Sequence, residues 1–248
     1  MKHSNKRKIF KAGDWVLYKT TGSNMEGKIS VDYQRVQAVL EGPYMGEPCV
    51  WIETGFGEKI DALDWGCAQI SENAFQDSIA ELRPNIYLRR LQSPSDDGIP
   101  RAMEVRTFDP KIPLPDFESR RPVIKASRPD TLLTPKGRIP CQYYEMVRTH
   151  KNVKSTPEAT IERGVESTVK RWLNPDLVPL TGIIREEEHK VYKTHAWPIG
   201  KLSSDFPEEI NGFDDLKTEL IDFGHDAKPM IAHRIRDSRD SRPIEIAP

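Results

Sequence analysis

The chain has 248 residues, of which 37% are apolar and 30% are charged, and its net charge is -1. A balanced charge creates no field that would attract nucleic acid, so a nucleic-acid-binding role is not expected. The twenty prolines favour a loop-rich β architecture over a helical bundle, since proline costs roughly 3 kcal/mol inside a helix. The length suits one large β domain.

The two ends of the chain differ from its middle. We expect a basic N-terminal arm over 1–12, a single β domain over 13–232 and a charged C-terminal tail over 233–248. No run of about 18 apolar residues is present, so no transmembrane segment is expected. The basic start lacks the apolar stretch of a signal peptide. Two compartments therefore stay open: the cytoplasm, or the periplasm or cell envelope if the chain is a mature form.

Three strands with short turns are expected first, over 14–20, 33–40 and 48–54. In the first of these, Trp15 and Leu17 share one face while Val16 and Tyr18 share the other, a pattern typical of a pleated strand. The turn residues of 21–24 and the glycines that follow the third strand separate these segments. Together they predict an antiparallel meander.

A helix is predicted over 71–82, because apolar residues recur there at spacings of three and four and Pro84 stops the pattern. The proline-rich stretch 110–135 is interpreted as a long surface connection. The polar stretch 150–164 suggests a short helix from Pro157. The remaining strands are expected over 86–91, 102–108, 139–147, 167–173, 181–187 and 216–223.

No catalytic motif is found: glycine-rich phosphate loops, nucleophile elbows and zinc-binding helices are all absent from the sequence. His189 and His195 lie in loop-like, charged sequence, where solvated histidines are expected and metal binding is the alternative. The acidic pairs 96–97 and 214–215 stand beside glycine, as in turns, and the glutamates 186–188 suggest a solvated strand end. We therefore expect no enzyme, no catalytic residue, no metal and no cofactor.

Three cysteines stand at 49, 67 and 141, too far apart for a zinc cluster of paired cysteines. One disulfide with one free thiol is compatible with this number. Three reduced, buried cysteines are equally compatible, because cysteine packs as a small apolar residue. The sequence leaves both alternatives open.

Large aromatic residues are placed within the predicted strands. They fit either an ordinary core or an apolar cavity lined from the inner face of a curved sheet. The second interpretation would add side chains from the predicted helix. The candidate ligand-binding residues are then Trp15, Leu17, Trp51, Phe75, Ile79 and Trp172.

Four groups of residues, 13–19, 50–54, 134–144 and 178–186 with 219–224, resemble bacterial envelope proteins of the lipoprotein-sorting (LolA/LolB-like) superfamily. The resemblance implies a mainly β fold: a curved antiparallel sheet that forms an incomplete barrel, with one or two helices covering its concave face. It also implies that the space between sheet and helix accepts an acyl chain.

The first functional hypothesis is therefore a non-catalytic binding or carrier protein whose partner is a lipid or an acylated protein. The alternative is a structural or interaction protein with a self-filled barrel, which binds partners through 110–135. A third hypothesis is a hydrolase built around His189 or His195. The oligomeric state is left open by the sequence.

Overall fold

The computed structural model describes residues 11–44, 47–71, 88–93, 101–104, 122–234 and 236–237. Their strands form one sheet in the order β12-β6-β5-β4-β3-β2-β1-β11-β10-β9-β8-β7. The strands are β1 (Trp15–Asn24), β2 (Ile29–Tyr44), β3 (Glu47–Gly57), β4 (Asp64–Ser71), β5 (Leu88–Ser93), β6 (Arg101–Glu104), β7 (Val123–Thr134), β8 (Gly137–Ser155), β9 (Ala159–Leu173), β10 (Ile183–Pro198), β11 (Glu208–Gly224) and β12 (Arg236–Asp237).

The sheet is antiparallel throughout except for β12, which runs parallel to β6. Its two end strands, β12 and β7, are not paired with each other, so it does not close into a barrel. The expected mainly β architecture with an open antiparallel sheet is confirmed. The helices of the described part are two short 3-10 turns, η3 (Ser203–Asp205) and η4 (Ala232–Arg234), and no described helix could span a membrane.

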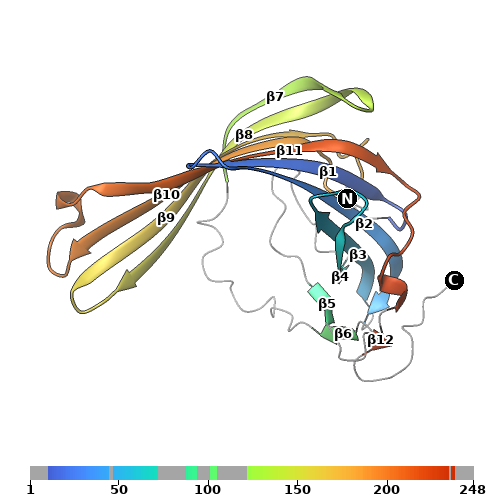
Figure 1. Cartoon of the computed structure of the whole chain (residues 1–248), viewed down its shortest axis with the longest axis horizontal. Helices are drawn as coiled ribbons and strands as arrows, with labels where there is room; N and C mark the ends of the chain where they lie inside the picture. Colours follow the sequence, from blue (N-terminus) through green and yellow to red (C-terminus); the bar gives the residue numbers. More distant parts are fainter. Residues whose placement is uncertain are drawn as a thin grey trace, which may run out of the picture.

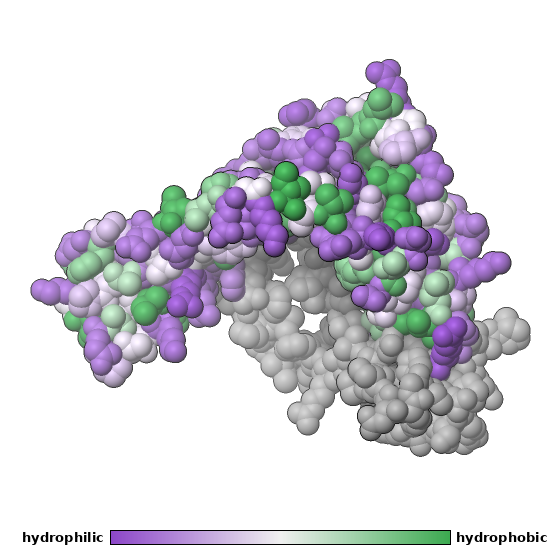
Figure 2. All heavy atoms as spheres, in the orientation of Figure 1, coloured by the Kyte–Doolittle hydropathy of each residue, from purple (hydrophilic) through white to green (hydrophobic). Residues whose placement is uncertain are grey.

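The sheet curves strongly and carries a projecting arm (Figure 1). The arm consists of the far ends of β8, β9, β10 and β11, while β2, β3 and β4 bend away on the other side. The first strand lies beside the eleventh, with Trp15 opposite Gly224 and Asn24 opposite Asp214. In Figure 2 the surface of the arm mixes hydrophilic and apolar side chains and shows no single apolar patch.

Two apolar clusters pack against opposite faces of β1–β4, because successive side chains of a strand point to opposite faces. The first cluster includes Val16, Tyr18, Ala38 and Ile52, and Val178 and Leu180 from the β9–β10 connection pack with it. The second cluster consists of Val39, Trp51, Cys67 and Ala232. Both faces of this part of the sheet therefore hold buried apolar side chains.

The second cluster is covered by the closing segment, which we define as residues 225–234. Ala227 and Ile231 pack against the cluster from this segment. Glu53, which is fully buried, binds the same segment through its carboxylate. A neighbouring side chain, Gln37, donates to Glu53 at 2.6 Å and to the carbonyl oxygen of Lys228 at 3.0 Å. The chain itself thus fills this face of the sheet.

Several expectations about local structure are wrong. The supposed surface connection contains a strand, β7, and β4 was not expected at all. No helix starts at Pro157, because residues 156–158 form the turn between β8 and β9. The helix predicted over 71–82 lies outside the described residues apart from Ser71, which ends β4.

Candidate functional site: a groove across four strands

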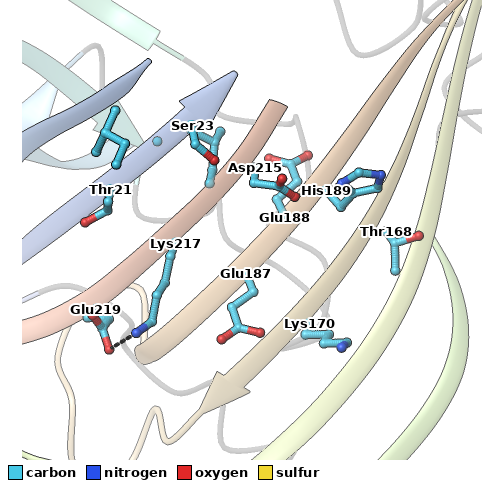
Figure 3. Close-up of a pocket in the computed structure, with 13 residues that line it drawn as sticks. Thr21, Ser23, Thr168, Lys170, Glu187, Glu188, His189, Asp215, Lys217 and Glu219 are labelled. Atoms are coloured by element: carbon cyan, nitrogen blue, oxygen red, sulfur yellow. Dashed lines mark hydrogen bonds and ion pairs between the residues drawn. The ribbon is translucent and has the colours of Figure 1, made fainter. Parts of the chain in front are cut away.

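A groove of about 720 Å³ lies across the middle of the sheet, with a lining that comes mainly from β1, β11, β10 and β9 (Figure 3). Its floor is built from side chains that face each other in cross-strand rows. Residues directly opposite in an antiparallel pair have their Cβ atoms about 5 Å apart, so each row is a line of contacting side chains. The pairing register therefore decides which groups meet in the groove.

The first row consists of Ser23, Asp215, His189 and Thr168, one residue from each of the four strands. Figure 3 shows these four side chains in this order. The Nδ1 atom of His189 lies 2.7 Å from a carboxylate oxygen of Asp215. The aromatic ring of Phe213 lies next to the imidazole, at a centroid distance of 6.0 Å.

The second row consists of Thr21, Lys217, Glu187 and Lys170. Charge alternates along it, and it also alternates along the strands. Lys217 binds Glu219 of its own strand at 2.8 Å, and Arg185 binds Glu187 of its own strand. Each charged group in this row therefore has neighbours of opposite sign, which lowers the net field over the groove.

The charges of the lining do not cancel completely. Lys170 and Lys217 contribute two positive charges, whereas Glu187, Glu188, Asp215 and Glu219 contribute four negative ones. The lining residues alone sum to 2 − 4 = −2. Arg185 and Lys190, which do not line the groove, bind Glu187 and Glu188 and compensate this excess. Such a groove offers donors and acceptors together.

The sequence did not predict this groove. His189 and His195 were expected in loops, but both lie within β10, and Asp214 and Asp215 lie within β11 rather than in a turn. Residues 186–188 were expected at a strand end and lie inside β10. The available signal was the alternation of charged and uncharged residues in 215–219, which is typical of strands with one polar face; in 185–189 every residue is ionisable, so that segment carried no such signal.

Those predicted ligand-binding residues that the structure describes do not line the groove. Leu17 and Trp51 are buried, and Trp51 belongs to the second cluster. The indole of Trp15 donates to Asp226 at 2.7 Å, and the guanidinium of Arg35 stacks 4.3 Å from its ring centre. Phe75 and Ile79 lie outside the described residues, so this set as a whole stays a prediction.

Trp172 is separated from the other predicted tryptophans. It packs in the first cluster, with the ring of Tyr143 at a centroid distance of 5.0 Å. Its indole N–H donates to Asp130 of β7 at 2.8 Å. This hydrogen bond lowers the pKa of Asp130 below its ordinary value. Trp172 therefore joins β9 to the edge hairpin.

Neither the cysteines nor any acidic group of the described part forms an evident metal centre. No set of three or more histidine, cysteine or acidic residues is gathered there in a way that could hold a metal ion. None of Cys49, Cys67 and Cys141 forms a disulfide. Burial, together with the nearby charge of Glu53, raises the pKa of the Cys67 thiol well above its ordinary value.

No protein-family model matches the chain, and no curated protein matches it, so membership of the lipoprotein-sorting superfamily stays a prediction. Among solved structures it resembles a presumed exported protein with a YmcC-like fold from Bacteroides fragilis, at 13% identity and a TM-score of 0.34, over 87% of this chain and 97% of that one. It also resembles a presumed lipoprotein from Parabacteroides distasonis, at 10% identity and a TM-score of 0.35, over 87% of this chain and 98% of that one.

Proposed function

We propose that this protein is a non-catalytic binding or carrier protein that holds the polar part of an amphipathic ligand, a lipid or an acylated molecule, in the groove across β1, β11, β10 and β9. The observation that carries the proposal is the groove itself. Its volume of about 720 Å³ lies within the range of roughly 300–1,000 Å³ that is usual for small-molecule sites.

The chemistry of the lining supports a zwitterionic or uncharged polar head group. Thr21, Ser23 and Thr168 supply hydroxyl groups that both donate and accept hydrogen bonds. Lys217 and Glu187, which stand opposite each other, supply charges of both signs. A head group that carries an ammonium and a phosphate can meet both, whereas a purely anionic group can pair only with the lysines.

Apolar side chains at the groove supply the second half of an amphipathic site. Ile29 lines the groove and is 68% exposed. Phe213, beside His189, is also exposed. Covering such side chains contributes roughly 25 cal/mol per Å² of apolar surface removed from water. Apolar atoms of a ligand that cover these side chains would gain this contribution.

The non-catalytic part of the proposal is supported by the exposure of the groove's histidine–aspartate pair. The side chains of His189 and Asp215 are 50% and 52% exposed. Enzymes exclude water from such pairs, because every electrostatic interaction is stronger in a site without water. A half-exposed pair lacks this advantage and suits hydrogen bonding to a ligand.

The test begins with native mass spectrometry of the full chain purified from its own host, followed by organic extraction and lipid analysis. A co-purifying lipid in stoichiometric amount is expected. Lysophosphatidylcholine and lysophosphatidylglycerol are then titrated below their micelle concentrations. The zwitterionic lipid is expected to bind more tightly than the anionic one.

Two threonine variants locate the site. Thr21→Trp fills the groove and is expected to abolish binding, while Thr149→Trp, an exposed residue of β8 that does not line the groove, is the matched control. Equal binding by Thr21→Trp and the wild-type chain contradicts the proposal. A clean apo mass combined with no binding of either lipid contradicts it as well.

A second candidate function is protein interaction through the edge of the sheet. β7 ends the sheet order, and its Val123, Ile124 and Leu133 side chains are 56%, 48% and 81% exposed. An edge strand can accept an extended segment of another chain. Pull-down with the wild-type chain and with Ile124→Pro tests this, and identical partners from both would count against it.

A further inference from the structure

A small recess lies beside the groove, under the turn that joins β7 to β8. Its volume is about 170 Å³, equivalent to about five or six water molecules at roughly 30 Å³ each. Glu219 lines both the recess and the groove, so the two spaces adjoin. The recess is lined by Leu132, Leu133, Pro135, Ile184, Leu220 and Ile221 on its apolar side.

One polar group of the recess has no hydrogen-bond partner. Arg185 lines the recess, and its Nε atom is buried without an acceptor. The other end of the guanidinium is occupied, because Nη2 donates to Glu187. A buried donor left unpaired destabilises the protein. An acceptor oxygen that entered the recess would remove this penalty.

The roof of the recess is the turn between β7 and β8. Residues 134–137 form a tight turn in which Gly137 has a φ of 101°, a conformation that favours glycine. Lys136 fixes this turn to β11 through an ion pair of 2.6 Å with Asp222, and both side chains are substantially exposed. Exposed ion pairs contribute little stability, so displacing the turn has a small cost.

We propose that this recess is the subsite for the acyl end of the ligand. The Nε–H of Arg185 donates to the carbonyl or carboxylate oxygen of the acyl group, and the first carbons of the chain lie against Leu132, Leu133 and Ile221. This inference rests on the proposed function, because it places the acyl part of the same amphipathic ligand next to the groove. It also gives a role to the one buried Arg185 donor that the fold leaves unused.

The experiment titrates the full chain with hexanoate, methyl hexanoate and hexylamine and follows backbone amide chemical shifts by NMR. Shifts that centre on residues 132–135, 184–185 and 219–221 are expected with the first two probes. Similar binding of acid and ester identifies an acyl carbonyl as the acceptor, and preference for the acid identifies a free carboxylate. Hexylamine binding as tightly as hexanoate would overturn the proposal.

Variants separate this site from the groove. Arg185→Gln is expected to weaken hexanoate binding about tenfold, since hydrogen bonds to charged groups are the stronger ones. Ile221→Phe is expected to block the recess, and Ile210→Phe, an exposed residue of the same strand, is its control. Hexanoate binding that is unchanged in both Arg185→Gln and Ile221→Phe, with native circular dichroism, would overturn the proposal.

The groove variant Thr21→Trp distinguishes a failure of the recess proposal from a failure of the groove proposal. Hexanoate is expected to bind this variant as it binds the wild-type chain, because Thr21 lines the groove and not the recess. If the lysolipid binds the wild-type chain but hexanoate does not shift the recess residues, the recess proposal fails while the groove proposal stands. If hexanoate binds and the lysolipid does not, the groove proposal fails instead.

Discussion

The carboxylate of Glu53 accepts a hydrogen bond of 2.6 Å from the backbone N–H of Ala232, 179 positions later in the chain. The same carboxylate also accepts from the N–H groups of Met230 and Ile231, at 2.8 Å each. Three successive backbone donors thus surround one buried negative charge, an arrangement that binds anions well. The side chain stands at the start of η4.

Glu53→Ala should therefore detach the closing segment. The substitution leaves these three donors without an acceptor, while Gln37 keeps its bond to the carbonyl oxygen of Lys228, and each unsatisfied buried group costs about 1–3 kcal/mol. We expect the free energy of unfolding to fall by roughly 3 kcal/mol or more, as measured by urea denaturation. Hydrogen exchange of the 230–232 amides should accelerate strongly. Glu58→Ala, an exposed change on the neighbouring loop, is the control, and equal effects of both changes would refute this role of Glu53.

Trp51→Ala distinguishes a filled core from a ligand-lined cavity. Trp51 is 4% exposed and packs with Ala232 of the closing segment, so its removal leaves a cavity in the protein itself. The expected loss of stability is roughly 3–5 kcal/mol, the same with and without lipid. Phe56→Ala, on the same strand but 53% exposed, should cost much less. If lipid restored the stability of Trp51→Ala, Trp51 would instead line a ligand cavity.

The buried hydroxyl of Tyr18 makes the fold less stable at high pH. Burial raises the pKa of its hydroxyl above the ordinary value of 10.0, and the hydroxyl bonds Thr181 and donates to the carbonyl oxygen of Ile183 at 3.0 Å. The folded state keeps this proton when the unfolded chain has already lost it. The stabilisation of the fold by the protonated hydroxyl is therefore complete below pH 10. It is lost as the pH rises further, by about 1.4 kcal/mol per pH unit.

Tyr18→Phe measures this contribution directly. The variant should be less stable than the wild-type chain by roughly 1 kcal/mol at pH 7, because Thr181 and Ile183 lose a partner. Between pH 10 and 11 the difference should shrink or reverse, since phenylalanine has no proton to lose. Denaturant titrations of both chains at pH 7, 9 and 11 check this. A constant difference across the series would show that the hydroxyl titrates normally in the folded state.

The central strands could be predicted from the sequence because each has one strongly apolar face. Val16 and Tyr18 in β1, and Val50 and Ile52 in β3, alternate with their neighbours and are buried in the first cluster. The ends of the strands could not be predicted in this way. β10 extends to Pro198 through charged residues that looked like a solvated end. Its partners Lys170 and Lys217, which flank Glu187, come from distant parts of the chain.

The groove was missed for the same reason. Its side chains become neighbours only through the register of β1, β9, β10 and β11, and that register depends on tertiary pairing. β7 was missed because Pro129 interrupts its pattern, although an edge strand tolerates proline. The aromatic residues fitted either an ordinary core or a lined cavity; Trp51 and Trp172 pack in clusters of the protein's own side chains, and the cavity interpretation stays a prediction.

The double change of His189 and His195 to alanine tests the non-catalytic proposal. His189 forms an exposed ion pair with Asp215, and His195 lies 2.9 Å from the carbonyl oxygen of Ser203. We expect less than about 1 kcal/mol of lost stability from the exposed pair and no change in any esterase activity of the purified chain. Loss of a measurable activity in the double variant, with unaltered folding, would establish an enzyme.

The thiols give a last prediction about the folded chain. Cys67 is buried opposite Glu53, and the raised pKa of its thiol keeps the reactive thiolate scarce at neutral pH. Iodoacetamide at pH 8 should modify Cys141, which is only half-buried, before Cys67 in the native chain. All three cysteines should react after denaturation without reductant, because none is held in a disulfide.

Mass spectrometry counts the modified thiols, and Glu53→Ala should expose Cys67 to the reagent. Protection of Cys67 that survives the loss of Glu53 would show that the closing segment stays in place without its carboxylate anchor.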